Sequence, residues 1–183
     1  MKESKTPDRL HYENDTLSLK FKFYVQGLMI SFSNKSGVPI KIKWEQLRMT
    51  ENGIDKKIEH VKISDEKNDI YKPPSTFPSK SVYNDFVVYA ANIYYLKEYG
   101  EEKLMITDMY PRDDRKQNRE AILNLKGQRI TLLFPIEIKN VAHSWVFNFF
   151  LDEIRSGRNL RRLNPKDAID FIDALGDPLI PVF

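Results

Sequence analysis

Apolar side chains recur at every second position in several segments of this sequence, and this alternation restricts the fold more than any other feature. A period of two places successive side chains on opposite faces of an extended strand, so each segment predicts a strand with one buried face. The clearest segments are residues 17–25, 28–32, 40–44, 130–138 and 145–151. Turn signals separate them and helical patterns are scarce. The sequence therefore predicts a mainly β, antiparallel β-sandwich, immunoglobulin-like or related.

The parity of the alternation changes at several points, and each change predicts a turn or a bulge. A two-residue turn at Gln26-Gly27 keeps the flanking apolar side chains on one face, with a bulge in one long strand as the alternative. The predicted pairs are Val25–Leu28, Phe23–Ile30 and Phe21–Phe32. We expect another bulge near Glu45-Gln46, and a hairpin turn at Asn52-Gly53 that leads into a strand around residues 57–63.

The second half of the chain predicts further strands joined by longer connections. Residues 64–80, with their prolines, are expected to cross between the sheets, and residues 81–99 to form a strand that could end in a helical turn. Pro135 predicts an edge strand or a bulge. The "NVAH" segment predicts a hairpin with the pairs Ile138–Trp145, Ile136–Phe147 and Phe134–Phe149.

With 183 residues the chain has the usual length of one domain. We expect a polar arm over residues 1–15 and the sandwich over residues 16–154. Residues 155–183 are expected to form a basic linker, a short helix and an extended tail, all packed on the same domain. Asn164 can cap that helix, with Pro165 at its first position.

Composition excludes several kinds of chemistry. The net charge of +3, from 29 basic and 26 acidic residues, is too small to indicate nucleic acid as a partner. Cysteine is absent, which excludes disulfides and thiolate zinc sites, and no apolar run reaches the length of a transmembrane helix. The histidines, His11, His60 and His143, lack the spacing of a zinc site or a nucleophile elbow and are expected to be surface or hydrogen-bonded residues. We expect no catalytic residue, no cofactor and no metal.

Two segments are candidate partner-binding surfaces. The basic segment "RSGRNLRR" could hold phosphate or an acidic partner, or be a solvated linker. Its arginines are Arg155, Arg158, Arg161 and Arg162. A tyrosine cluster could contact protein or carbohydrate, because tyrosine buries area while its hydroxyl stays hydrated, or it could lie along a sandwich edge. Its members are Tyr89, Tyr94, Tyr95 and Tyr99.

Four stretches carry a resemblance to known proteins: "ISFSNKSGVPIKIKWEQL", "PPSTFPSKS", "GQRITLLFPIEI" and "WVFNFFL". They resemble small bacterial envelope lipoproteins of Bacteroides-type bacteria with an immunoglobulin-like or related sandwich. The positions that carry the likeness, over about half the chain, are Asn34, Ser36, Pro39, Ile40, Ile42, Trp44, Gly53, Pro73, Pro74, Gly127, Pro135 and Ile136. The resemblance implies export and a lipid-modified cysteine, which would have to precede Met1. The helix expected from Asn164 departs from the family.

The sequence therefore predicts a non-catalytic binding or structural module of a bacterial cell envelope, in the periplasm or at the outer membrane, with a protein or glycan partner. One alternative is a cytoplasmic interaction protein that binds nucleic acid or an acidic partner through the arginines. A second is a glycan-binding or glycan-active sandwich, which needs a cleft lined by the tyrosines and two carboxylates. The polar start "MKESKTPDRLHYEND" has no apolar export signal, which leaves the cytoplasmic address open.

Overall fold

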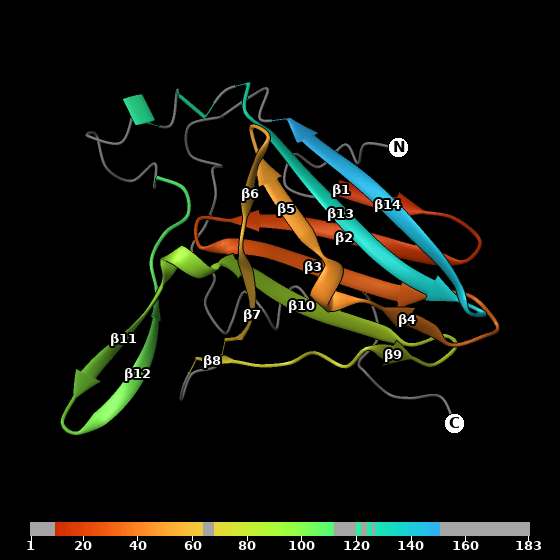
Figure 1. Ribbon diagram of the computed structural model, residues 1–183, viewed down its shortest axis with the longest axis horizontal. Coiled ribbons are helices and arrows are strands. Elements are labelled where there is room, and N and C mark those ends of the chain that lie inside the picture. The colour runs from red at the N-terminus through yellow and green to blue at the C-terminus, as the bar shows by residue number, and fades with distance from the viewer. Residues whose placement is uncertain (1–9, 64–67, 112–119, 122–123, 126, 151–183) are drawn as a thin grey trace.

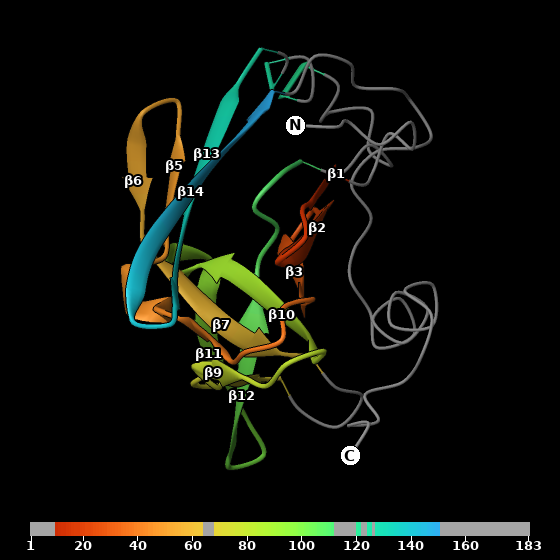
Figure 2. The same ribbon diagram turned by 90° about the vertical axis from the view of Figure 1, so that its right-hand side faces the viewer.

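Two antiparallel sheets face each other across a shared apolar interior (Figures 1 and 2). The computed structural model describes residues 10–63, 68–111, 120–121, 124–125 and 127–150. The first sheet has the order β1-β2-β3-β10-β7-β8. Its strands are β1 (Leu10–Glu13), β2 (Leu17–Tyr24), β3 (Gly27–Asn34), β10 (Val82–Tyr89), β7 (Ile58–Lys62) and β8 (Asp69–Ile70). This arrangement confirms the predicted β-sandwich.

The second sheet is organised around β13 (Arg129–Ile138), which pairs along its whole length with β14 (Val141–Phe150). On its other side β13 pairs first with β5 and then with β4, so the order is β6-β5-β13-β4-β9. The remaining strands are β4 (Ile40–Ile42), β5 (Arg48–Glu51), β6 (Ile54–Lys56) and β9 (Thr76–Phe77). Leu10–Glu13, at the end of the expected polar arm, form β1 and belong to the first sheet.

The interior between the sheets contains the apolar residues that the alternation assigns to it. Phe21, Ile42, Phe134 and Phe147 are all on strands and all buried in one cluster. The ring centroids of Phe21 and Phe147 lie 4.9 Å apart across the two sheets. Aromatic contacts of this kind add about 0.5–1.5 kcal/mol beyond the burial of area, so these pairs help to hold the sheets together.

The β2–β3 hairpin exists as predicted, but its turn is Val25-Gln26 and the predicted register is wrong. Phe21 is opposite Ile30 instead of Phe32. The cause is Gly27, which lies inside β3, where a Cβ would collide with the carbonyl oxygen of Val87. Gly27 is thus needed for close approach of β10 and not for the turn. The shift by two residues leaves every side chain on its predicted face.

The β13–β14 hairpin is tighter than predicted. Its turn is Lys139-Asn140, whose positive φ angles of 50° and 63° are those that a two-residue type I′ turn requires. Ile138 is therefore opposite Val141, and Phe134 is opposite Trp145 rather than Phe149. His143, expected in the turn, is within β14. The shift of four residues again preserves the faces, which is why the alternation does not reveal it.

The break between β4 and β5 corrects two further predictions. A 3-10 turn, η1 (Trp44–Gln46), stands where a bulge was expected. Pro135 is in a central strand and not at an edge. Its carbonyl accepts a hydrogen bond from the Lys43 N–H, so the side of Pro135 that lacks an N–H faces this break between the two strands. The ladder therefore loses no hydrogen bond there.

Other connections agree with the sequence. Asn52-Gly53 forms a hairpin turn with both φ angles positive. The chain between β7 and β10 crosses from the first sheet to the second, since β8 pairs with β7 and β9 with β4. The segment 81–99 differs from the prediction, because the 3-10 turn η2 (Ala90–Asn92) divides it and a second strand, β11 (Ile93–Glu98), follows the turn. The expected helix from Asn164 and the basic linker lie outside the described residues.

Candidate functional site

Two strands, β11 (Ile93–Glu98) and β12 (Glu101–Ile106), form a hairpin that pairs with neither large sheet. This hairpin, residues 93–106, is called the tyrosine arm below. It projects from the body of the sandwich in both views (Figures 1 and 2). Six residues of strand correspond to a length of about 20 Å. The arm therefore reaches well beyond the surface that surrounds its base.

The base of the tyrosine arm is packed on the outer face of the first sheet. Leu104 and Ile106 are buried there, and Ile93 packs beside them. The cluster that receives them consists of Tyr24, Met29, Val61, Phe86 and Val88. Because burial of a leucine or isoleucine side chain contributes about 1.5–3 kcal/mol, the base is held firmly against the sandwich.

Hydrogen bonds add to this attachment. The Nδ2 of Asn92 donates to the Asp108 carbonyl over 2.9 Å, and the Asn92 carbonyl accepts from the Thr107 N–H at 2.8 Å, so one residue joins the two ends of the arm. Beyond Thr107, the N–H groups of Met109 and Tyr110 both donate to the carbonyl of Val25 in the β2–β3 turn. Both ends of the arm are thus fixed to the domain.

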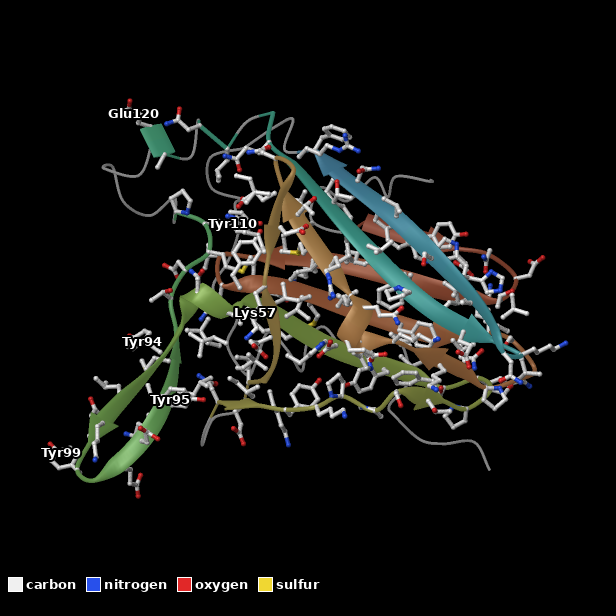
Figure 3. The ribbon with its side chains drawn as sticks, viewed as in Figure 1. Lys57, Tyr94, Tyr95, Tyr99, Tyr110 and Glu120 are labelled. Carbon is white, nitrogen blue, oxygen red and sulfur yellow. The ribbon has the colours of Figure 1, made fainter. Side chains whose placement is uncertain are left out.

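The outer part of the arm exposes three of the four tyrosines that the sequence analysis singled out. Tyr94 is 45% exposed, Tyr95 58% and Tyr99 fully. Neighbouring positions on one strand face opposite sides, and Figure 3 shows Tyr94 and Tyr95 extending to opposite sides with Tyr99 at the tip. The fourth, Tyr89, is buried between the sheets and does not belong to this surface. The tyrosines lie on a separate hairpin and not along a sandwich edge.

The tip of the arm has an unusual turn residue. Tyr99 has a φ of 51° and Gly100 a φ of 84°. Glycine tolerates this conformation, whereas a bulky residue with positive φ is a conformational outlier. Backbone strain of this kind costs about 1–3 kcal/mol and is often found at functional sites. An exposed aromatic ring therefore occupies a position where asparagine would fold more easily.

A buried polar cluster lies between the sheets and was not found from the sequence. The Asp85 carboxylate accepts hydrogen bonds from the Tyr71 hydroxyl at 2.7 Å and from His60 Nδ1 at 2.6 Å. The Tyr83 hydroxyl lies 2.7 Å from that of Tyr71 and donates to it, because the Tyr71 proton is directed at Asp85. Tyr83, Asp85 and Val87 alternate along β10, and this is the sequence signal that places Asp85 on the buried face.

The chemistry of this cluster is that of a structural network. Burial raises the pKa of Tyr71 well above its usual range, with the Asp85 charge adding to the effect, and burial raises the pKa of Tyr83 to about 12. Both phenols therefore stay protonated and serve as donors. The Asp85 side chain is fully buried. Tyr71 follows β8, so the network ties the crossover chain to β10.

The other two histidines also agree with the expectation of surface or hydrogen-bonded residues. His11 Nε2 lies 3.0 Å from the Ser18 hydroxyl and 3.2 Å from the Glu13 carboxylate. His143 is exposed and stacks on Trp145. Within the described ranges, no group of three or more histidine, aspartate and glutamate side chains could hold a metal ion.

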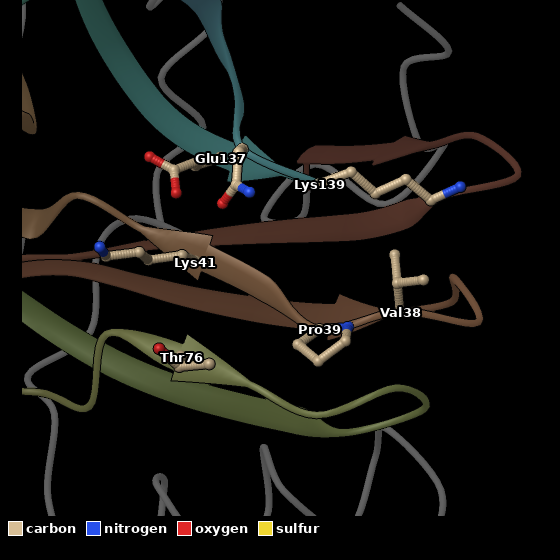
Figure 4. A pocket seen from close by; sticks show the side chains of 7 residues that line it. Val38, Pro39, Lys41, Thr76, Glu137 and Lys139 are labelled. Carbon is tan, nitrogen blue, oxygen red and sulfur yellow. The ribbon is translucent and has the colours of Figure 1, made fainter.

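An open hollow lies near the β13–β14 turn (Figure 4). It is lined by Val38, Pro39, Lys41, Thr76, Glu137, Lys139 and Asn140. A hydrogen bond between Lys43 and Glu137, 2.8 Å long, raises the pKa of the lysine and lowers the pKa of the carboxyl group beside this hollow. None of the candidate tyrosines lines it. The arginines Arg155, Arg158, Arg161 and Arg162 lie outside the described residues.

No protein-family model matches the chain, and no curated protein matches it. Several solved structures resemble it weakly, among them the following two. The GAE domain of GGA2p from Saccharomyces cerevisiae has 11% identity and a TM-score of 0.35, covering 81% of this chain and 100% of that one. A protein from Archaeoglobus fulgidus has 12% identity and a TM-score of 0.29, with 80% and 95% covered. TM-scores this low support no conclusion about function. Among the described residues, no helix is long and apolar enough to cross a membrane.

Proposed function

We propose that this chain is a non-catalytic binding module and that the tyrosine arm is the surface that contacts a protein partner. The observation that carries the proposal is the contrast within the arm: its base is packed and hydrogen-bonded, while Tyr94, Tyr95 and Tyr99 are exposed at its outer end. Aromatic side chains have few rotatable bonds, so on a hairpin with a fixed base they lose little entropy on binding, which favours affinity.

The side chains of the arm fit a protein surface. Tyrosine is enriched at the centres of protein interfaces, where it buries a large area and still forms a hydrogen bond through its hydroxyl. Leu96, 38% exposed, lies on the same face as Tyr94 and enlarges the apolar area. Charged residues of both signs flank these contacts: Lys97, Glu98, Glu101, Glu102 and Lys103. This pattern resembles an apolar contact with a polar rim.

The location in a bacterial cell envelope belongs to the same proposal and rests on the resemblance described above. Fractionation of the source cells is its test, and recovery of the natural protein only in the cytosol would contradict it.

The nucleic-acid alternative depends on the four arginines outside the described residues and stays a prediction. A salt-dependent gel shift that disappears when these arginines become glutamate would support it. The glycan alternative also stays a prediction. The tyrosines that it requires in a cleft lie on a hairpin and do not line the hollow of Figure 4.

The contact surface is tested by site-specific crosslinking in the source cells. A photoreactive benzoylphenylalanine replaces Tyr99 in one variant and Ile54 in a control. Ile54 is an exposed apolar residue of β6, away from the arm. We expect a discrete covalent adduct at position 99, identified by mass spectrometry, and none at position 54. Equal adducts at both positions would contradict a contact specific to the arm.

Binding to the purified partner is then measured by calorimetry. We expect the double variant Y95S/Y99N to bind at least tenfold more weakly, which is a loss of about 1.4 kcal/mol. The matched control I54S should bind as the parent chain does. Retention of full affinity by Y95S/Y99N, with unchanged folding, would exclude the tip of the arm as the contact.

A further inference from the structure

β14 has a free edge whose composition is unusual. Its ten residues, Val141–Phe150, pair with β13 in one unbroken register, without a bulge. Val141 and Ile138 close the two-residue turn, so the even-numbered residues of β14 direct their backbone N–H and C=O groups away from β13. These residues are Ala142, Ser144, Val146, Asn148 and Phe150. None of their backbone groups pairs with another part of the described chain.

The other edges of the two large sheets are protected and this one is not. Natural sheets protect their edges with short strands, charged residues and proline. β6 has three residues, two of them charged, and β9 has two residues followed by a proline. β1 and β8 are also short and contain charged or titratable side chains. β14 has no lysine, arginine, aspartate, glutamate or proline, and His143 is its one titratable residue; it exposes Val146 (56%) and Phe150 (57%) on its outer face.

We propose that the edge of β14 pairs antiparallel with the same edge of a second copy of this chain, around a two-fold axis at Val146. The sequence of the strand is self-complementary in this register. Val146 is opposite Val146 of the second copy, Ser144 is opposite Asn148, and Ala142 is opposite Phe150. On the inner face Trp145 is opposite Phe147. The small Ala142 therefore meets the large Phe150, and the polar side chains meet each other.

The hydrogen bonds of the Asn148 side chain support this register. Its Oδ1 accepts hydrogen bonds from the Thr131 hydroxyl at 2.8 Å and from the Arg129 guanidinium at 2.7 Å. These bonds orient the side-chain amide and leave its Nδ2 as the donor. Ser144 of the second copy presents a hydroxyl acceptor directly opposite. A slip by one position on each strand would instead pair Ser144 with Val146 and Ala142 with Asn148.

The pairing has a consequence for the molecule. An edge that pairs with itself forms a closed two-fold dimer, so no further edge of the same kind remains open. The tyrosine arm is a two-stranded sheet separate from the sheet that contains β14, and it stays exposed in such a dimer. The dimer would present two arms, and two linked contacts bind more strongly than one where both can engage. The dimer itself does not depend on the function of the arm.

Because Val146 faces itself across the axis, substitutions there give a specific test in the full chain. Sedimentation of the parent chain should show a species of twice the 21.6 kDa monomer that dissociates on dilution. V146K and V146E should each be monomeric, since each places like charges opposite each other. An equimolar mixture of the two should form a heterodimer, because the charges are then opposite.

The control is I54K, which adds the same charge to an exposed apolar residue on the β6 edge and should leave the dimer intact. Thermal unfolding checks that all variants fold. A parent chain that stays monomeric over a wide concentration range would overturn the proposal, as would be expected if residues 151–183 of the same chain covered the edge. A V146K protein that still dimerises, or a V146K and V146E mixture without heterodimer, would overturn it as well.

Discussion

Tyr95 and Leu104 are directly opposite each other in the β11–β12 ladder and share one face of the arm, yet Leu104 is buried and Tyr95 is 58% exposed. The first sheet covers the Leu104 side chain but does not cover the Tyr95 side chain. Leu104 packs with Phe86 and Val88 in the cluster that holds the base. The pair therefore marks the boundary between the part of the arm that contributes to stability and the part that is free for contact.

The first prediction follows from this boundary. Leu104→Ala should lower the free energy of unfolding by about 2–4 kcal/mol, because it removes buried apolar volume from a packed cluster. Tyr95→Ser should change it by less than about 0.5 kcal/mol, as is usual for exposed positions. Urea denaturation measures both. Equal destabilisation by the two substitutions would mean that the outer part of the arm is also packed.

Replacement of Tyr99 by asparagine should stabilise the protein. Asparagine adopts the positive φ of this turn more readily than tyrosine, so Tyr99→Asn should raise the free energy of unfolding by about 0.5–1 kcal/mol. Thermal denaturation measures the change, and Tyr99→Phe, which keeps the ring and the strain, is the control. A loss of stability in the asparagine variant would show that the ring makes a stabilising contact.

Gly27 and Gly37 provide a matched pair of substitutions. A Cβ at Gly27 would collide with the carbonyl of Val87 and with the side chains of Phe86 and Val88, whereas a Cβ at Gly37 would meet no atom within 4 Å. Gly27→Ala should destabilise by about 2–3 kcal/mol through strain in a packed interior. Gly37→Ala should be neutral or slightly stabilising, by up to about 1 kcal/mol. Chemical denaturation distinguishes them, and equal effects would be contrary to this packing.

The loss of stability on replacement of Asp85 should depend on which residue replaces it. Asp85→Ala removes the acceptor for the Tyr71 hydroxyl and for His60 Nδ1, which leaves Tyr71 with only its contact to Tyr83 and leaves His60 Nδ1 without its acceptor, at a cost of about 2–4 kcal/mol. Asp85→Asn keeps an oxygen acceptor and a similar shape, so its cost should be about half as large. Calorimetric unfolding compares the two. An alanine variant as stable as the parent would mean that the network does not hold the crossover chain.

The buried tyrosines predict a decrease in stability at alkaline pH. Burial raises the pKa of Tyr83 and of Tyr89 to about 12, against 10 in the unfolded chain. Between pH 10 and 12 the unfolded chain therefore loses phenolic protons that the folded chain keeps. The free energy of unfolding should be unaffected by these groups below pH 10 and fall as the pH rises through this window.

Urea titrations at several pH values measure this decrease. The variant Tyr83→Phe should show a smaller decrease than the parent chain. A flat profile between pH 10 and 12 would contradict the burial of these hydroxyls.

By itself the sequence determined which side chains face the interior, because the period of two assigns each residue of a strand to a face. It also determined the Asn52-Gly53 turn, where the residue types match a turn with two positive φ angles. Register could not be determined in this way. A slip by two residues at Phe21, or by four at Phe134, keeps every side chain on its face.

Tertiary structure decided the rest. Gly27 is placed by the approach of β10, and Pro135 is tolerated in a central strand because β4 and β5 separate beside it. The tyrosines of residues 94–99 were recognised by type, but only packing on the first sheet buried Leu104 and left Tyr95 exposed. Asp85 met His60 and Tyr71 because two strands and the crossover segment after β8 converge there. Local patterns assign faces, whereas contacts between distant segments decide which faces are covered.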